Sequence, residues 1–275
     1  MKKKNLRAKK HLGQNFLYDP AIAGRIAAAC GAGADDLVVE LGPGRGILTD
    51  ALLAQGARIL AVELDEPLVD ELRTRYAGES RVEILHADLT KVQLTALLAE
   101  RGIERCRLAG NIPYYLTRDV LFDFLVDHHA VIDGAVIMVQ KEVGDRIVSE
   151  PGSRVYGITS VVLQSLYDVR AVMRVLPGSF TPRPKVASVV LGFAPQAVSP
   201  FREGELEAFR QLVKNLFGQR RKTIQNTLKS AYGIDAEVLE GIHQQTGIDL
   251  GSRPEQLSYE QFLDITRVLT HKNQE

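Results

Sequence analysis

The chain has 275 residues, which is enough for one large domain with a buried core and a second, smaller domain. Its residues are 45% hydrophobic and 25% charged, and no run of about 20 apolar residues occurs, so we expect a soluble protein without a membrane span. Cys30 and Cys106 lie far apart and show no metal-ligand spacing. This predicts neither a disulfide framework nor a metal site, and it favours a reducing, cytoplasmic location.

The formal net charge is zero, but basic residues are concentrated in three segments without an acidic residue: 1–18, 170–185 and 208–232. Any one such segment is usually solvated surface, whereas three together predict a surface that faces phosphate groups. The candidate phosphate contacts are Lys9, Lys10, Arg183, Lys185, Arg220, Arg221 and Lys222.

The first predicted helix begins at Asp19-Pro20, where Asp suits the N-cap and Pro the first helical position, and it ends at Gly31. The pattern then alternates between strands and helices. Strands are expected over 37–41, 58–64, 81–85, 105–110 and 134–139, and helices from 47, from 67, around 94–100 and over 116–127. This order predicts an α/β fold with a mainly parallel, doubly wound sheet.

Two further strands, over 169–176 and 187–193, flank a proline-rich loop and are expected to close the sheet as an antiparallel pair. After residue 200 the apolar spacing becomes helical, which predicts a small all-α domain of four helices. We therefore expect one domain over 1–199, including the basic N-terminal segment 1–18, and a helical domain over 200–275.

A glycine loop, Glu40-Leu-Gly-Pro-Gly-Arg-Gly46, follows the first predicted strand. Because ligands of open α/β sheets bind at the carboxyl ends of the strands, this loop is expected to contact a cofactor. Glu63 ends the next strand, where it could bind ribose hydroxyls, and Asp88 follows the third strand, where it could bind an adenine amine. Taken separately, each feature is more often ordinary strand-end or turn chemistry.

The spacing of this loop is G-x-G-x-G, whereas the dinucleotide-binding dehydrogenases have G-x-G-x-x-G. Glu40 precedes the first glycine by two residues, and an acid there suits a cofactor with an amino group and a sulfonium better than an anionic pyrophosphate. Both observations favour S-adenosylmethionine.

The tetrapeptide Asn111-Ile112-Pro113-Tyr114 follows a predicted strand downstream of the glycine loop. The Asn111 amide oxygen and the Ile112 carbonyl could each accept one N–H of an exocyclic amine and so turn its lone pair towards an electrophile. Tyr114 could stack on the ring, and Pro113 would stiffen the loop. An ordinary turn is the alternative for the tetrapeptide alone, but its position favours amine alkylation.

With these motifs in this order, the chain resembles the ribosomal RNA adenine N6-dimethyltransferases, which are class I methyltransferases with a Rossmann-like sheet. The other segments that carry the resemblance are Lys10–Leu17, His86–Asp88, Gln140–Gly144 and Phe180–Val186. Two more, Phe217–Thr223 and Arg253–Ser258, resemble the helical domain of the bacterial KsgA type, which acts on small-subunit RNA. One departure is Tyr115-Leu-Thr117, where the family often has Asn-Ile-Ser/Thr.

The resemblance implies dimethylation of N6 of two adjacent adenosines in the terminal hairpin loop of 16S RNA, with the small ribosomal subunit as partner and no metal. It places Tyr114 and Phe180 on the two faces of a flipped adenine, and Asn111 between amine and cofactor. The cofactor contacts that it implies are Gln14, Asn15, Leu17, Gly42, Gly44, Glu63, Leu64, Asp88, Leu89 and Asn111.

Three alternatives stay open from the sequence. The large-subunit RNA methyltransferase of macrolide resistance shares the catalytic motifs, but residues 217–223 argue against it. A binding protein that checks ribosome assembly is a second, and a dehydrogenase a third. The absence of a heptad or another self-association pattern predicts a monomer.

Overall fold

The structure of the protein is a computed structural model, and it describes residues 14–272. These residues form two compact units. The first contains the described residues up to 144 together with 169–195, and the second contains 145–168 together with the residues from 196 onward.

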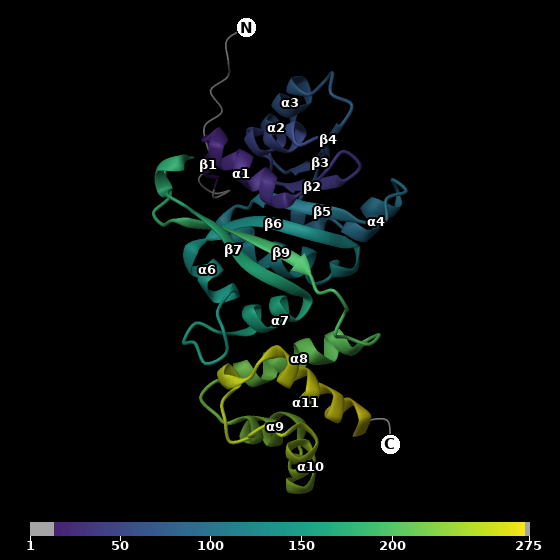
Figure 1. Cartoon of the computed structure of the whole chain (residues 1–275), viewed down its shortest axis with the longest axis vertical. Coiled ribbons are helices and arrows are strands. Elements are labelled where there is room, and N and C mark those ends of the chain that lie inside the picture. The colour runs from purple at the N-terminus through teal and green to yellow at the C-terminus, as the bar shows by residue number, and fades with distance from the viewer. Residues whose placement is uncertain (1–13, 273–275) are drawn as a thin grey trace. The chain divides into compact units, whose positions relative to one another are not determined.

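The first unit is built on a seven-stranded sheet with the order β4-β3-β2-β5-β6-β9-β7 (Figure 1). The pairs β2–β3, β3–β4, β2–β5 and β5–β6 are parallel, and β9 pairs antiparallel with β6. The predicted strands are thus confirmed, and β7 lies outside β9 at the edge. The bounds are β2 Leu37–Leu41, β3 Arg58–Glu63, β4 Val82–His86, β5 Cys106–Asn111, β6 Ile132–Gln140, β7 Tyr167–Val175 and β9 Ser188–Pro195.

The first four helices of the first unit follow the predicted pattern, whereas a helix over 141–147 was not predicted. Asp19 caps α1 by accepting from the backbone N–H groups of Ala21 and Ile22, and Gly31 ends the helix with φ of 64°. The helices are α1 Pro20–Cys30, α2 Ile47–Ala54, α3 Glu66–Arg75, α4 Leu94–Ala99 and α6 Lys141–Ile147, which extends into the second unit.

The helix expected over 116–127 differs from the structure. The segment forms a 3₁₀ turn at Tyr114–Leu116, one α turn α5 at Thr117–Asp119, and a widened π turn at Val120–Phe124. Such π turns are single features that interrupt helices, often at functional sites. Apolar periodicity does not distinguish a widened turn from a regular one, so the sequence did not indicate it.

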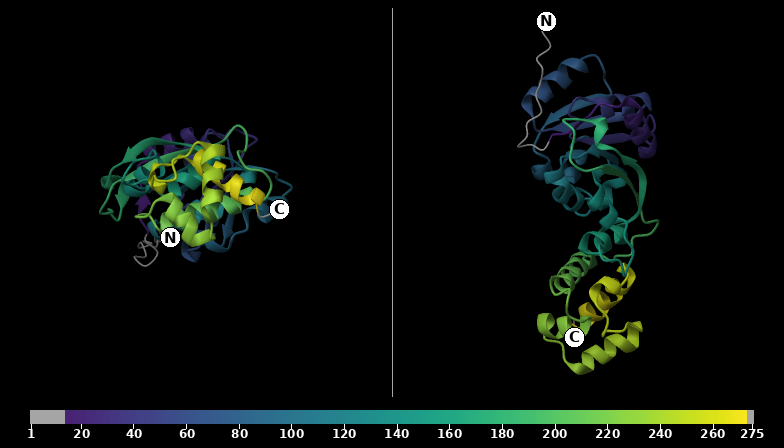
Figure 2. Two further views of the ribbon diagram at one scale, coloured as in Figure 1. Left: turned by 90° about the horizontal axis from the view of Figure 1, so that it is seen from below. Right: turned by 90° about the vertical axis from the view of Figure 1, so that its left-hand side faces the viewer.

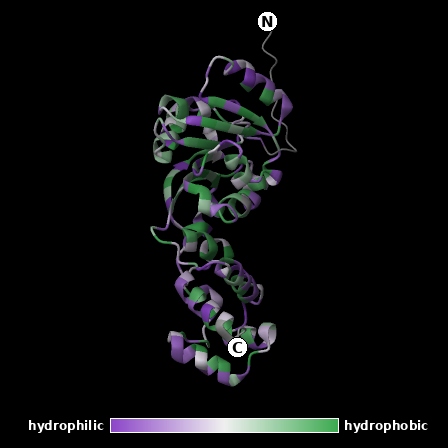
Figure 3. Cartoon of the chain, turned by 90° about the vertical axis from the view of Figure 1, so that its right-hand side faces the viewer, coloured by the Kyte–Doolittle hydropathy of each residue, from purple (hydrophilic) through white to green (hydrophobic). Residues whose placement is uncertain are grey.

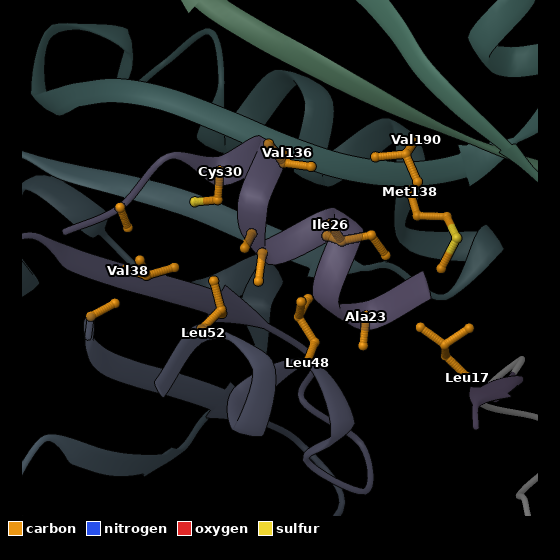
Figure 4. Packing of buried hydrophobic residues seen from close by; sticks show 14 of the residues in the cluster. Leu17, Ala23, Ile26, Cys30, Val38, Leu48, Leu52, Val136, Met138 and Val190 are labelled. Carbon is orange, nitrogen blue, oxygen red and sulfur yellow. The ribbon is translucent and has the colours of Figure 1, made fainter. Parts of the chain in front are cut away.

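The main core of the first unit lies between α1, α2 and one face of the sheet. Figure 4 shows Leu52 of α2 beside Val38 of β2, and it shows Ile26 of α1 in the same cluster as Val136 and Met138 of β6, a strand separated from β2 by β5. Figure 3 shows hydrophobic residues concentrated along the strands, as expected for a sheet buried on both faces.

A second, two-stranded sheet pairs β1, Phe16–Leu17, with β8, Phe180–Thr181. The two strands are antiparallel, and Leu17 lies opposite Phe180. Residues 177–184 were expected to form only a loop, and Pro182 and Pro184 limit the strand because proline cannot donate to a sheet. This pairing connects the N-terminal motif with the Phe180 segment.

The second unit is a group of helices (Figure 2). Aromatic rings form part of its core: Phe217 stacks on Phe262 at 5.8 Å and lies 6.3 Å from Tyr156, measured between ring centroids. The four helices predicted after residue 200 are confirmed, and α7 precedes them. The helices are α7 Ile158–Leu166, α8 Glu205–Gly218, α9 Ile224–Tyr232, α10 Ala236–Thr246 and α11 Tyr259–Lys272.

The compact units therefore differ from the expected division at residue 200 in one segment. Residues 145–168 group with the later helices, because Tyr156 packs on Phe217 and the Gly152 N–H donates to the Glu255 carbonyl at 2.6 Å. These contacts join positions far apart in the sequence. Within residues 14–272, no helix is both long and apolar enough to cross a membrane.

A buried ion pair in the second unit provides a test of its stability. Glu205 is 8% exposed, and its Oε1 lies 2.9 Å from Nε of Arg267. Burial opposes ionisation of Glu205, but hydrogen bonds from Arg267 and the Arg202 N–H outweigh it and lower the pKa. We expect Arg267→Met to lower the free energy of unfolding by about 2 kcal/mol, because it leaves a buried carboxylate without its cation.

Urea unfolding of the full chain measures this effect. Because the pKa of Glu205 is lower in the folded state, its carboxylate stabilises the fold at pH values above the ordinary glutamate pKa. This stabilisation is lost as the pH falls through the folded-state pKa, so acid should reduce the difference in unfolding free energy between wild type and variant. Arg210→Met is the control, since its partner Glu207 is 78% exposed, and we expect a loss under about 1 kcal/mol. Equal losses in the two variants would contradict the prediction.

Candidate active site

One pocket lies at the carboxyl ends of the parallel strands in the first unit. The empty space between its lining residues is about 950 Å³ when the open solvent at its mouth is counted. The parallel order of the strands brings their carboxyl ends to one edge, so segments from 14 to 116 meet there. The predicted site residues that line it are Gln14, Asn15, Leu17, Gly42, Gly44, Glu63, Leu64, Asp88, Leu89, Asn111, Ile112, Pro113 and Tyr114.

The glycine loop between β2 and α2 requires glycine for steric reasons. Gly44 has φ of 56°, and a Cβ there would lie 3.0 Å from the ring of Phe16. Gly46 has φ of 77°, and a Cβ there would lie 2.6 Å from the hydroxyl oxygen of Tyr76. A larger residue at either position would meet both backbone strain and a neighbouring ring. The tight turn keeps the loop backbone at the pocket wall.

Glu63, the last residue of β3, fastens this loop. Its Oε2 accepts from the Gly44 N–H at 3.1 Å, and its Oε1 accepts from the N–H groups of Leu64 and Asp65, each at 2.9 Å. Burial raises the pKa of Glu63, and the three backbone donors counteract that shift. The carboxylate therefore connects the loop to the end of β3, at the place predicted for ribose binding.

Glu40, in β2, has a different environment. It is 1% exposed, and its Oε2 accepts from the Thr49 hydroxyl at 2.6 Å, while Oε1 is buried without a hydrogen-bond partner among the described residues. Burial is the largest cause that raises the pKa of Glu40 to about 8. Because a buried acceptor without a donor is costly, an oxygen in this state at the pocket fits a ligand that supplies an N–H, as the cofactor's amino group would.

Asp88 follows β4 and faces the same pocket. Its Oδ1 accepts from the backbone N–H of Thr90 at 3.0 Å and from the Thr90 hydroxyl at 2.8 Å, which fixes the side chain. Its Oδ2 has only Lys91 nearby, at 4.0 Å, among the described residues, so this oxygen can accept from an adenine amine. Leu64, which is 40% exposed, offers apolar surface in the same pocket.

The tetrapeptide Asn111–Tyr114 forms the end of β5 and the turn after it. Nδ2 of Asn111 donates to the Asn15 carbonyl at 3.2 Å, and no described residue donates to its Oδ1. Ile112 is 1% exposed, and Pro113 has φ of −53° and ψ of 133°, which holds the turn extended. The hydroxyl oxygen of Tyr114 lies 3.1 Å from Oγ of Ser188. The amide of this pocket-lining residue is thus anchored through its nitrogen and keeps an acceptor oxygen for a ligand.

Phe180 is the predicted catalytic residue that the structure does not bring to the pocket lining. It is 3% exposed and belongs to the core cluster, where it lies opposite Leu17. Its ring is closed to solvent in this structure, and its role opposite Tyr114 stays a prediction.

The predicted phosphate contacts fall into separate groups. Lys9 and Lys10 lie outside the described residues, and Arg183 and Lys185 are exposed in the first unit. In the second unit, Arg220 donates to the Arg154 carbonyl at 2.9 Å and lies 3.8 Å from the Glu255 carboxylate. The remaining two, Arg221 and Lys222, are exposed, and no acidic partner is found for them among the described residues.

Several pocket residues were missed as site residues. The guanidinium of Arg45, a residue of the glycine loop, lies 4.9 Å from the ring centroid of Phe16, and both residues line the pocket. Tyr115, which is 50% exposed, also lines the pocket. Phe16 lies inside the N-terminal motif and Tyr115 next to the tetrapeptide, so their position beside predicted site residues could have identified them. No sequence signal pointed to Ser188, because only the fold brings it to Tyr114.

Comparison with known proteins agrees with this geometry. A family model described as ribosomal RNA adenine dimethylase matches residues 5–271. "Ribosomal RNA small subunit methyltransferase A" of Geobacter metallireducens is 44% identical over 270 residues, covering 98% of both chains. The protein of the same name from Koribacter versatilis is 44% identical over 236 residues, covering 82% of both.

Solved structures show the same fold. A dimethyladenosine transferase from Plasmodium falciparum has a TM-score of 0.76 at 23% identity, covering 94% of this chain and 98% of that one. The 23S rRNA methyltransferase ErmE has a TM-score of 0.74 at 25% identity, covering 93% and 100%. These structures confirm the predicted Rossmann-like class I methyltransferase fold. The chain belongs to the ribosomal RNA adenine dimethylase family, whose reaction is the S-adenosylmethionine-dependent dimethylation of adenine N6 in ribosomal RNA.

Proposed function

We propose that the chain dimethylates N6 of two adjacent adenosines in the 3′-terminal hairpin loop of 16S RNA. The observation that carries the chemistry is the Asn111 amide, which is anchored through Nδ2 and leaves Oδ1 to accept at the pocket. The choice of RNA is supported by relatives named for the small subunit at 44% identity over nearly the whole chain. The exposed cations Arg221 and Lys222 support a phosphate-rich partner.

The partner in this proposal is the small ribosomal subunit during its maturation, and the place is the cytoplasm, where ribosomes mature in bacteria. We propose that the chain acts as a monomer. The support for this is the sequence, which shows no heptad or other self-association pattern.

The residues at the pocket fit S-adenosylmethionine, which supplies an electrophilic methyl group on its sulfonium. Glu40, with its buried unpaired oxygen, would accept from the amino group of the methionine part, beside the backbone of Gly42 and Gly44. Glu63 would bind the ribose, and Asp88 the adenine amine through Oδ2. Gln14, Asn15, Leu17, Leu64 and Leu89 would complete the wall.

The target amine would be oriented by Oδ1 of Asn111 and the Ile112 carbonyl, each accepting one N–H. The nitrogen lone pair, normally delocalised into the adenine ring, is then directed at the methyl group. Tyr114 would hold one face of the ring. For Phe180 to hold the other face, its side chain would have to leave the core cluster in which it lies opposite Leu17. Catalysis is positioning and electrostatic stabilisation, and no base is needed before attack because the alkylated, cationic amine loses its proton readily.

The first experiment is transfer of labelled methyl groups from S-adenosylmethionine to small subunits that lack the modification, with large subunits as the control. Nucleoside analysis identifies the product. Dimethyladenosine confined to the small subunit is the expected result. Label on large-subunit RNA would instead indicate a resistance-type enzyme, and tight small-subunit binding without label would indicate an assembly factor.

Asn111→Ala should reduce single-turnover methyl transfer by roughly 10²–10³-fold, the usual effect of removing a preorganised hydrogen-bonding group. RNA affinity, measured by filter binding, should change less than about twofold, because the amide contacts only the target base in this proposal. Asn215→Ala, in α8, is the control and should retain wild-type transfer. If RNA affinity fell as much as transfer did, Asn111 would have a structural role.

Replacing Arg221 and Lys222 together by Ala should weaken RNA binding and flatten its salt dependence. The slope of log K against log salt should fall by roughly 0.7 to 0.9 for each phosphate that the variant no longer neutralises. Arg220 contributes less in this view, since it is already held by Glu255 and the Arg154 carbonyl. Lys214→Ala with Lys229→Ala removes the same charge from the same acid-free segment and is the control. The same slope in both double variants would mean that no specific phosphate contact exists.

Affinity for S-adenosylmethionine should rise with pH until the pKa of Glu40, about 8. Below that pKa the carboxyl of the free protein is protonated, and it must lose its proton before it can accept from an ammonium group. The affinity should therefore change by up to about tenfold per pH unit. Calorimetry across this range measures it. Glu40→Gln should give a flatter response, while titration of the ligand itself is common to both proteins. Parallel curves would exclude a role for Glu40.

A further inference from the structure

Ser188 lies beside the loop that carries Tyr114 because of the direction of one strand, β9. It is the first residue of β9 and pairs with Gln140, the last residue of β6. Because β9 is antiparallel to β6, its amino end lies at the sheet edge where the parallel strands have their carboxyl ends. Ser188 is therefore placed beside the turn after β5, 74 positions from Tyr114 in the sequence.

The backbone around Ser188 is fixed on two sides. The Lys141 N–H donates to the Ala187 carbonyl at 2.9 Å, which extends the β6–β9 ladder by one bond. On the next residue, Cγ1 of Val189 lies 2.1 Å from where a Cβ on Gly144 would be, so α6 packs directly on the start of β9. Such packing leaves Ser188 little freedom to move with the loop.

The two hydroxyl groups depend on each other. Ser188 is 0% exposed, and Tyr114 is the one hydrogen-bond partner found for its side chain among the described residues, at 3.1 Å. A buried hydroxyl left without a partner is unfavourable, so rotating the Tyr114 ring away would leave Ser188 unsatisfied. The bond thus restrains the tip of a ring whose base is already held by Pro113 and the turn at Tyr114–Leu116.

We propose that Ser188 is a positioning residue for the methyl transfer, holding the Tyr114 ring at the angle at which it stacks on the target adenine. This inference rests on the proposed function and assigns a role to a residue outside the pocket lining. A stacked base turns with the ring beneath it, so the angle of Tyr114 decides whether the adenine amine meets Asn111 and the methyl group. Transfer between groups held in line is sensitive to shifts of this kind.

The effect should be larger for the second methyl transfer than for the first. The monomethylated amine is bulkier and has one N–H left, so Asn111 and Ile112 can no longer both restrain it. Its alignment then depends more on the stacked ring. Loss of the Ser188 bond should therefore release more monomethyladenosine.

The test compares Ser188→Ala, Tyr114→Phe and the double variant in single-turnover methylation of small subunits, with quantification of both methylated nucleosides. Each single variant should lower the rate of the second transfer roughly tenfold and raise the monomethyl share. The double variant should be no slower than either, because both changes remove the same bond. Affinity for S-adenosylmethionine should stay at the wild-type value.

Tyr114→Phe keeps the ring and adds no group, so it tests the bond even if Ser188→Ala folds poorly. Ser165→Ala is the matched control: Ser165 is also 0% exposed, and its hydroxyl donates to the Val162 carbonyl at 2.8 Å in α7. It should keep the wild-type product ratio. A purely structural role for Ser188 would slow both transfers equally and leave that ratio unchanged.

Two results would overturn the proposal for Ser188 while leaving the proposed function intact. One is a double variant whose rate loss equals the product of the two single losses, and the other is an unchanged ratio of monomethyladenosine to dimethyladenosine in Ser188→Ala. The wild-type chain is assayed first. If it formed no methylated adenosine on small subunits, the proposed function and this inference would both fall.

Discussion

The antiparallel pairing of β9 with β6 is the constraint on which the candidate active site depends most. The parallel strands β2 to β5 deliver the glycine loop, Glu63, Asp88 and Asn111 to one edge of the sheet. A parallel β9 would bring its other end there, and the Tyr114 hydroxyl would have no buried partner. The strand direction thus connects the sheet core to the loop that carries Asn111 and Tyr114.

Two buried acids at the pocket illustrate how burial can serve opposite purposes. Glu63 accepts from three backbone N–H groups, so its carboxylate is satisfied before any ligand binds and stabilises the loop. Glu40 has one hydroxyl donor and a buried oxygen without a partner among the described residues, so burial keeps its pKa high. The first acid shapes the site. In the proposed function, a ligand that carries a donor would satisfy the second acid, which is how a buried charge becomes tolerable.

In the proposed function, local charge and not net charge accounts for binding to RNA. The formal charge is zero, yet Arg221 and Lys222 are exposed without acidic partners in the part of the chain that the structure describes. Arg220 differs from its neighbours in the sequence, because it already contacts the Glu255 carboxylate and the Arg154 carbonyl. Adjacent cations are therefore not equivalent. Binding to phosphates draws on the cations that the fold leaves unpaired.

The sequence by itself determined the alternating strands and helices, the cap at Asp19, the four C-terminal helices and the pocket residues next to strand ends, because these follow from local periodicity and capping chemistry. Only the tertiary structure decided contacts between distant segments: Tyr156 on Phe217, which draws 145–168 into the helical unit, and Ser188 on Tyr114. It also decided that Phe180 is buried with Leu17 and not exposed at the pocket. Such contacts depend on how distant elements pack, and for Ser188 on strand order and direction, which no local pattern encodes.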